Sequence, residues 1–478
     1  MGFTSIPGAG DITPAAKKQT LPSAYLDFTS GANDWSQQYL PDLMEKEAEV
    51  FGQRTISGFL SQIGAEEAMA ADQVIWSEQG RLHLSYKGCA IAGNIITIGT
   101  DVDGNSIGSG DHAVRIGDMI LVSAASGTAS VVAHVTLVST TTVTAVPYEI
   151  AGTLLAATGA TSGTTDVSCL VIGSEFDKGD NYSGSAARTA NEPSFAQFSN
   201  QPIIMKDFYH VSGSDTSQIG WVEVTGEEGQ NGYLWYLKAA GDTRARFSDY
   251  VEMSMLEAKK ELNANQTGRT KGTEGLFAAL EDRGNVSNAF LGTAAQNLLD
   301  FDLTLAQLDT QGAIEENMMF LNRGTSLKID DMLASMNSYG AGGTSFGVFN
   351  NSEDMALNLG FSGFRRGSYD FYKSDFRYLN DAATRGLINK SLAADAIRGV
   401  FVPAGVTSVY DQALGKNMKR PFLHVRYRAS EMESRKMKTW TTGSVGASTS
   451  SLDAMEMHFL TERCLVTQGA NNFVLLKG

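Results

Sequence analysis

The sequence predicts an α+β protein whose chain carries a small inserted all-β domain. Three observations support this class. Residues 243–266 repeat apolar side chains at helical spacing, residues 88–173 hold short β-prone runs between polar turns, and residues 459–478 (FLTERCLVTQGANNFVLLKG) have strand character. A chain of 478 residues is too long for a single core, so two or three domains are expected.

The net charge is acidic, although the fraction of charged residues is low. The formal net charge is −16, and 19% of the residues are charged against 42% hydrophobic. A protein that binds nucleic acid tightly needs clustered Lys and Arg, so this balance disfavours such binding, although it is compatible with a container whose wall must not adhere to its contents. The first residues show no basic region followed by an apolar run, and no run of about 18 apolar residues occurs, so neither a signal peptide nor a membrane span is expected.

The three cysteines, Cys89, Cys169 and Cys464, lie far apart in the sequence and show no CxxC spacing. This spacing predicts neither a disulfide framework nor a zinc site. It favours a reducing compartment.

The first 193 residues change character three times. Residues 1–41 hold four of the nine prolines and few aromatic side chains, which predicts an extended arm without a core of its own. Residues 42–72 have helical character, and residues 73–87 turn strand-like. Residues 88–173 predict a barrel or sandwich because short runs rich in Val, Thr and Ala alternate with Gly, Asp and Ser clusters.

The helix expected at 243–266 is the longest regular element. Its apolar stripe consists of Phe247, Val251, Met255, Ala258 and Leu262. Its outer face is expected to carry Arg246, Asp249, Glu252, Lys259, Lys260 and Glu261. This pattern predicts a helix that lies half-buried across a sheet. Beyond it, the apolar run 317–321 followed by Thr325 or Ser326 as a cap predicts a strand and a helix, as in α/β units.

One short motif is compatible with catalysis. Residues 343–347 spell GxSxG, with Ser345 at the nucleophile position and Asp375 and His424 as partners in chain order. A nucleophile elbow needs an apolar strand before the serine and a helix after it, and the flanks NSYGAGG and VFNNSED supply neither. We therefore interpret the motif as a glycine-rich loop and predict no catalytic residue.

No motif predicts a metal or cofactor. Asp101, Asp103 and Asn105 resemble the start of a calcium loop, but the sixth and twelfth positions hold Ser106 and His112 instead of Gly and Glu. A hairpin turn is the interpretation. The six histidines show no HxxxH spacing, and neither a Walker A motif nor a GxGxxG after a strand is present.

Three segments together resemble the HK97-fold major capsid proteins of tailed double-stranded DNA bacteriophages. Residues 194–221 (SFAQFSNQPIIMKDFYHVSGSDTSQIGW) resemble that family's entry into its core domain. The helix at 243–266 resembles its spine helix, and residues 459–478 resemble its closing strand pair. The order of arm, extended loop, long helix, α/β region and returning strands also fits.

The resemblance implies an HK97-like capsid fold and a structural function without an active site. Copies would form the hexamers and pentamers of an icosahedral shell in the virion, made in the host cytoplasm, that encloses DNA without sequence-specific binding or membrane contact. Scaffold, portal and decoration proteins are further partners that it allows. No Lys/Asn pair for covalent crosslinking can be aligned.

The resemblance also implies a division of the chain. The expected segments are an arm and helical segment at 1–72, an extended-loop region at 73–193 with the β domain at about 88–173, a P-domain at 194–290, an A-domain at 291–430, and C-terminal return strands at 431–478. Two alternatives from other classes stay open: a β-rich binding or adhesion protein that works through 88–173, and a serine hydrolase that uses Ser345.

Overall fold

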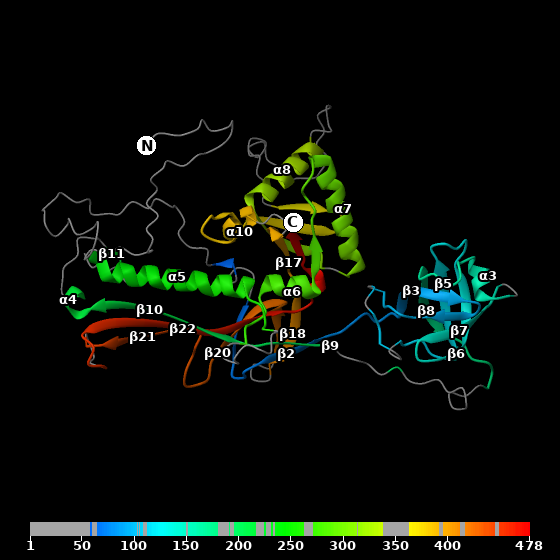
Figure 1. Cartoon of the computed structure of the whole chain (residues 1–478), viewed down its shortest axis with the longest axis horizontal. Coiled ribbons are helices and arrows are strands. Elements are labelled where there is room, and N and C mark those ends of the chain that lie inside the picture. Colours follow the sequence, from blue (N-terminus) through cyan, green and yellow to red (C-terminus); the bar gives the residue numbers. More distant parts are fainter. Residues whose placement is uncertain are drawn as a thin grey trace. The chain divides into compact units, whose positions relative to one another are not determined.

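The computed structural model describes residues 58–59, 65–102, 104, 106–108, 112–149, 152–179, 191, 196–216, 224–225, 231–232, 235–261, 271–312, 314–337, 363–391, 395–411, 416–444 and 449–478. The chain divides into two compact units (Figure 1). Unit 1 takes Met1–Trp76 and Ser199–Gly478, and unit 2 takes Ser77–Phe198. The expected arm at 1–41 lies outside the described residues, so it stays a prediction.

Unit 1 contains a five-stranded sheet built around one long strand. β22 (Ala454–Thr467) pairs antiparallel with β10 (Ile203–Ser212) along one edge, and with β20 (Leu423–Arg428) and β21 (Lys438–Gly443) along the other. β1 (Ala65–Met69) adds to β20 as its parallel neighbour. We call this the first sheet.

The strand β1 corrects the expectation of helix over 42–72. Its sequence AEEAM favours a helix by local propensity, since Ala and Glu are good helix formers. Pairing with β20 from Ala65↔His424 to Met69↔Arg428 overrides that preference, because it satisfies the backbone with a partner far along the chain. Residues 42–57 of the same expectation lie outside the described part of the chain.

The long helix α5 (Trp235–Glu257) lies along β10 and β22 (Figure 1). Phe247 and Val251 on its apolar stripe are buried against Phe459 of β22, and the two phenyl rings have centroids 6.2 Å apart. The stripe is therefore confirmed through Met255, which is fully buried. At about 1.5 Å per residue, a helix of 23 residues is roughly 35 Å long.

The bounds of this helix differ from the expected 243–266. α5 begins eight residues earlier and ends at Glu257, so Ala258 follows the helix, and Leu262 lies outside the described residues. The helix ends where the chain segment before α6 crosses it. The amide of Gly275 donates to the Ala258 carbonyl at 2.8 Å, and a Cβ on Gly275 would lie 2.8 Å from the Leu256 carbonyl oxygen. This close crossing takes the hydrogen bond that another helical turn would use.

Glu252 is a second correction, because it was expected on the outer face of the helix. Its side chain is buried, and its Oε2 accepts a hydrogen bond from the Gly58 amide at 2.8 Å. Next to Gly58, the ring of Phe59 packs in the core with the rings of Phe320 and Phe376. Residues 58–59 thus cover a helix face that the sequence pattern assigns to solvent.

The second sheet of unit 1 has six strands in the order β13-β23-β17-β14-β16-β15. The strands are β13 (Asn285–Ser287), β14 (Glu316–Leu321), β15 (Gly363–Arg366), β16 (Tyr369–Asp375), β17 (Ile397–Pro403) and β23 (Val474–Lys477). The helices are α6 (Leu276–Arg283), α7 (Ala294–Thr310), α8 (Arg323–Asn337), α9 (Arg377–Asn380) and α10 (Arg385–Ser391). Every residue of β17 is buried, as expected for a strand with protein on both faces of its sheet.

The expected strand and helix around 317–332 are confirmed as β14 and α8. The cap differs from the expectation: Asn322 Oδ1 accepts the Thr325 amide at 2.8 Å, so Asn322 caps the helix instead of Thr325 or Ser326. The two C-terminal strands are also present, but they belong to different sheets. β22 lies in the first sheet, and the short 3₁₀ turn Ala470–Asn472 leads into β23 of the second.

Unit 2 contains a closed six-stranded barrel in the order β3-β4-β7-β6-β5-β8. Its elements are β3 (Ser85–Ala92), β4 (Ile95–Thr97), β5 (Asp118–Ala124), β6 (Val131–Val138), β7 (Thr142–Pro147), α3 (Leu154–Thr158) and β8 (Val167–Ser174). Its core is drawn entirely from residues between Tyr86 and Val171. Full closure leaves a small barrel without open edges.

The remaining elements are short. β2 (Val74–Glu78) pairs with β9 (Ala196–Asn200), so the strand on which the chain enters unit 2 pairs with the strand on which it returns. The others are α4 (Gly213–Thr216), β11 (Val224–Thr225), β12 (Asn231–Gly232), β18 (Val406–Asp411) and β19 (Lys416–Pro421).

Candidate functional site

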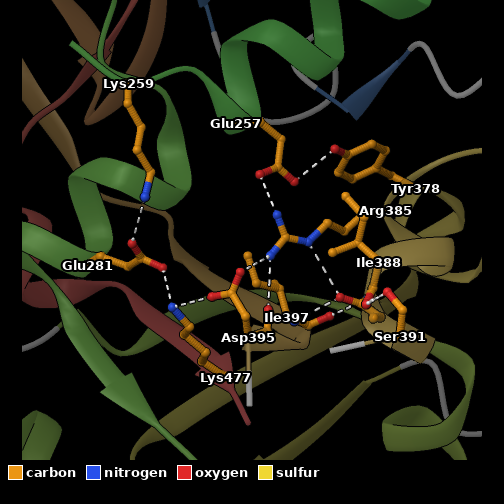
Figure 2. Close-up of polar contacts among 11 residues, drawn as sticks. Glu257, Lys259, Glu281, Tyr378, Arg385, Ile388, Ser391, Asp395, Ile397 and Lys477 are labelled. Atoms are coloured by element: carbon orange, nitrogen blue, oxygen red, sulfur yellow. Dashed lines mark hydrogen bonds and ion pairs between the residues drawn. The ribbon is translucent and has the colours of Figure 1, made fainter. Parts of the chain in front are cut away.

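A connected set of charged side chains, together with one tyrosine, lies at the C-terminal end of α5 (Figure 2). We call it the α5-end network. It comprises Lys259, Glu281, Lys477, Asp395, Arg385, Glu257 and Tyr378.

Arg385 is the centre of this network. Its Nη1 lies 2.6 Å from Glu257 Oε2, and its Nη2 lies 3.3 Å from Asp395 Oδ2 and donates to the Asp395 carbonyl at 2.9 Å. The Tyr378 hydroxyl donates to Glu257 Oε1 at 2.8 Å. Burial and the Glu257 carboxylate raise the pKa of Tyr378, so its proton stays in place at any physiological pH.

Lys477 continues the network toward the C-terminus. Its Nζ lies 2.7 Å from both Glu281 Oε1 and Asp395 Oδ1. Hydrogen bonds to Asp395 and Glu281 raise the pKa of Lys477, and the same lysine lowers the pKa of Asp395. Burial alone would raise the pKa of Glu281, but Lys477 and Lys259 outweigh it and lower that pKa.

The α5-end network is suited to holding elements together. Its residues come from the end of α5, from α6, from α9 and α10, from the turn before β17, and from β23. Each named charge has an opposite charge within hydrogen-bond or ion-pair distance. The network therefore fixes the end of the long helix to the second sheet.

A second group of charges lies where β1 joins the first sheet. The Glu67 carboxylate forms ion pairs with two arginines: its Oε1 lies 2.8 Å from Arg420 Nε, and its Oε2 lies 2.7 Å from Arg426 Nη1. Burial would raise the pKa of Glu67, yet the two arginines lower it overall. On the neighbouring residue, Glu66 Oε1 lies 3.4 Å from Arg463 Nη1. These pairs explain how a strand carrying two glutamates is retained at this edge.

The three residues of the hydrolase alternative are not brought together in the described part of the chain. Ser345 lies outside the described residues. Asp375 ends β16 in the second sheet and pairs with Arg323 at 2.6 Å. His424 is buried in β20 of the first sheet, where its Nδ1 is 3.1 Å from the Pro421 carbonyl oxygen. Burial and Arg426 lower the pKa of His424 to about 4, so the ring is neutral at pH 7.

The calcium-like segment forms a turn. Gly104 takes a positive φ of 87° and donates its amide to the Asp101 carbonyl at 3.2 Å, while Thr100 and Ser106 form an antiparallel bridge. Asp103 and Asn105 lie outside the described residues. Among the residues that the structure describes, no group of three His, Cys, Asp or Glu side chains could hold a metal ion. In the same part of the chain, no helix is long and apolar enough to cross a membrane.

One surface feature went unrecognised in the sequence. Phe208 of β10, His458 of β22 and Trp440 of β21 stand in one row across three paired strands. The Phe208 and His458 rings are 6.2 Å apart and the His458 and Trp440 rings 5.1 Å apart, each pair stacked. Phe208 is 58% exposed. Exposure alternates along β10, and apolar residues lie on both faces of this strand. This alternation was the sequence signal that could have indicated an exposed apolar face.

Comparison with known proteins gives matches among solved structures only. No protein family matches, and no curated protein matches. A chain from Microbacterium phage Oxtober96 is 9% identical with a TM-score of 0.38, covering 95% of this chain and 99% of that chain. A chain from the capsid of a native GTA particle is 10% identical with a TM-score of 0.37 at the same coverage. A chain from the capsid structure of cyanophage P-SCSP1u is 10% identical with a TM-score of 0.33, covering 63% of this chain and 80% of that chain.

Proposed function

We propose that this chain is the major capsid protein of a tailed double-stranded DNA bacteriophage, with an HK97-like fold, and that many copies assemble into an icosahedral head. The function is structural, and no residue is assigned a catalytic role. The proposal includes the division into arm, extended-loop region with the inserted β domain, P-domain, A-domain and return strands.

One observation carries the proposal: the three segments that resemble the capsid family in sequence pack together in space. β10, from the segment 194–221, pairs with β22 over ten residues, from Ile203↔Arg463 to Ser212↔Ala454. α5 packs on this strand pair through Phe247 and Phe459. Parts of the three segments that resemble the family thus form one helix-on-sheet layer, which supports the proposal.

A single buried residue joins the same regions. Asn200, 1% exposed, donates to the Leu465 carbonyl at 2.6 Å and to the Glu274 carbonyl at 3.0 Å. Its Oδ1 accepts the Glu274 amide at 2.9 Å and the Thr273 hydroxyl at 3.1 Å. The side chain therefore links the end of β9, the C-terminal part of β22 and the segment between α5 and α6.

The surface of unit 1 supports contacts with further copies. Phe208 and Trp440 expose aromatic rings on the first sheet, and Leu299 and Leu303 are each more than half exposed one turn apart on α7. Exposed apolar side chains that cluster in this way are typical of interaction surfaces. The net charge of −16 would keep the wall from adhering to enclosed DNA.

Particle formation tests the proposal. The purified chain, alone and after co-expression with the other head proteins of the phage that encodes it, is sized by light scattering and imaged by electron microscopy. We expect capsomers or closed shells. A monomer under both conditions would contradict the capsid function and would favour the binding-protein alternative.

A surface variant tests the role of the aromatic row. Phe208→Glu places a charge on an exposed position, so the subunit should keep its melting temperature while particles are lost. Phe208→Tyr keeps the ring and should assemble as the unmodified chain does. Normal shells from Phe208→Glu would remove this face from the proposed contacts.

A further inference from the structure

The first and last strands of the barrel carry two cysteines that face its interior. β3 and β8 pair antiparallel, with Ser85 opposite Leu170 and Tyr86 opposite Cys169. Cys89 and Cys169 are 0% and 3% exposed, and both belong to the barrel core. The third cysteine, Cys464, is also buried, but it lies in β22 of unit 1.

A backbone irregularity turns Cys89 inward. Strand alternation after the inward-facing Tyr86 would point residue 89 outward, because side chains alternate with a period of two. The register shifts between Tyr86 and Cys89, and Gly88 there has a φ of 66°. A glycine in the left-handed region with one extra residue is typical of a β-bulge. The bulge places Cys89 opposite Val167, two residues along β8 from Cys169.

The two side chains lie near each other, because β3 and β8 are paired, Cys89 stands two register positions from Cys169, and both belong to the same buried core. We propose that Cys89 and Cys169 form a reversible disulfide that joins the first and last strands of the barrel. A small-molecule disulfide is the oxidant class that would drive the reaction. This inference does not depend on the proposed function, because it concerns the barrel alone.

The reaction is a double thiol–disulfide exchange. The thiolate of one cysteine attacks one sulfur of the oxidant, forming a mixed disulfide and releasing the first small thiolate. The second cysteine then attacks the protein sulfur of that mixed disulfide, and the second small thiolate leaves. Two protons pass from the protein thiols to the two released thiolates, so the protein loses two electrons and two protons and the oxidant gains both.

The environment assigns the first step to Cys89. The neighbouring Cys169 thiol lowers the pKa of Cys89, and Cys89 together with burial raises the pKa of Cys169. Cys89 is therefore the thiol that ionises first and attacks first. The disulfide requires the two sulfurs to approach to about 2.05 Å, and the bulge at Gly88 is the place where the backbone can adjust.

Burial determines when the reaction is fast. Neither sulfur is open to solvent in the closed barrel, so a small oxidant reaches them during folding or local opening of the β3–β8 pair. Once formed, the bond closes a loop over residues 89–169, and the barrel can no longer open between its first and last strands. A cross-link over a loop of this length stabilises mainly by restricting the unfolded chain.

The test uses the full chain refolded in a buffer of oxidised and reduced glutathione. Free thiols are then blocked and the peptides are analysed by mass spectrometry without reduction. We expect a peptide pair joining Cys89 to Cys169 with the mass of two hydrogens lost, and Cys464 recovered as a blocked thiol. The barrel transition should rise by about 5 °C or more and return to its starting value after reduction.

Variants provide the controls. Cys464→Ala should leave both the cross-linked peptide and the redox-dependent shift unchanged, whereas Cys89→Ala and Cys169→Ala should each abolish both. Recovery of Cys89 and Cys169 as blocked thiols, a cross-link to Cys464, or an oxidised barrel that melts below the reduced one would each overturn the proposal. Because the peptide map is read on the unmodified chain, it decides even where an alanine variant fails to fold.

Discussion

Arg385 Nη1 lies 2.6 Å from Glu257 Oε2, and this contact ties the last residue of the long helix α5 to the helix α10. The arginine side chain is 9% exposed and the glutamate side chain 29%. A charge that is buried to this extent is stable only with its partner, so the pair makes the end of α5 dependent on the second sheet.

Replacing Arg385 with methionine should destabilise unit 1. The change keeps much of the apolar stem but leaves Glu257 and Asp395 without their shared cation, and we expect a loss of about 2–3 kcal/mol, less than for a fully buried pair because both carboxylates are partly solvated. Urea unfolding measures it. Arg365→Met is the matched control: that side chain is 65% exposed and lies 3.6 Å from Asp370, so its removal should change the stability by less than about 0.5 kcal/mol. Equal midpoints for the two variants would show that the network carries no stability.

Asn200→Ala should be among the most damaging polar substitutions. It removes a buried amide that donates to two carbonyls and accepts from the Glu274 amide and the Thr273 hydroxyl, leaving those groups without partners. We expect a loss of about 3 kcal/mol, since each buried group left unsatisfied costs about 1–3 kcal/mol and water can replace some of the bonds. Gln201→Ala, at the next position, breaks one long bond of 3.4 Å to the Lys271 carbonyl and should cost less than about 1 kcal/mol. If thermal denaturation ranks the two variants in the opposite order, the proposed link between the segments is wrong.

The stability of unit 1 should fall between pH 6.5 and about 4 partly because of His424. Its pKa is lowered from 6.5 to about 4 in the folded chain, so the unfolded chain binds a proton in this window that the folded chain does not. Stability from this residue is thus present above pH 6.5 and lost as the pH falls, by up to about 3 kcal/mol. His424→Gln should flatten the dependence, and the exposed His83→Gln should not. Identical slopes for all three proteins, measured by urea titration at pH 7 and 4.5, would refute the assignment.

Removal of the barrel should leave unit 1 folded. The core of the barrel contains no side chain from outside residues 86–171. Replacing residues 81–192 with a short Gly/Ser linker therefore deletes no part of the cores built around α5 and the two sheets. We expect circular dichroism to show one cooperative melting transition, with a melting temperature close to that of unit 1 in the full chain. As the control, excision of residues 363–403 removes three strands of the second sheet and should prevent folding. Global unfolding after excision of the barrel would mean that the two units depend on each other.

The patterns that survived in the structure are local ones. Phe247, Val251 and Met255 are buried in α5 as their spacing predicts, and the run 317–321 falls within β14. The β-prone runs between residues 88 and 173 also form strands, and these close into one barrel. In each case the preference of a short segment and its pattern of burial agree, so a window of a few residues is sufficient to predict the element.

The sequence by itself determined the apolar positions Phe247, Val251 and Met255 of the long helix and the strand character of the runs between residues 88 and 173, because helix and strand periodicities are local properties. The tertiary structure decided the rest. α5 ends at Glu257 because Gly275 crosses it, AEEAM becomes a strand because β20 pairs with it, and Glu252 is buried because residues 58–59 cover it. Cys89 meets Cys169 because a bulge at Gly88 and barrel closure bring β3 and β8 together. Each depends on a partner distant in the chain, whose position no local pattern encodes.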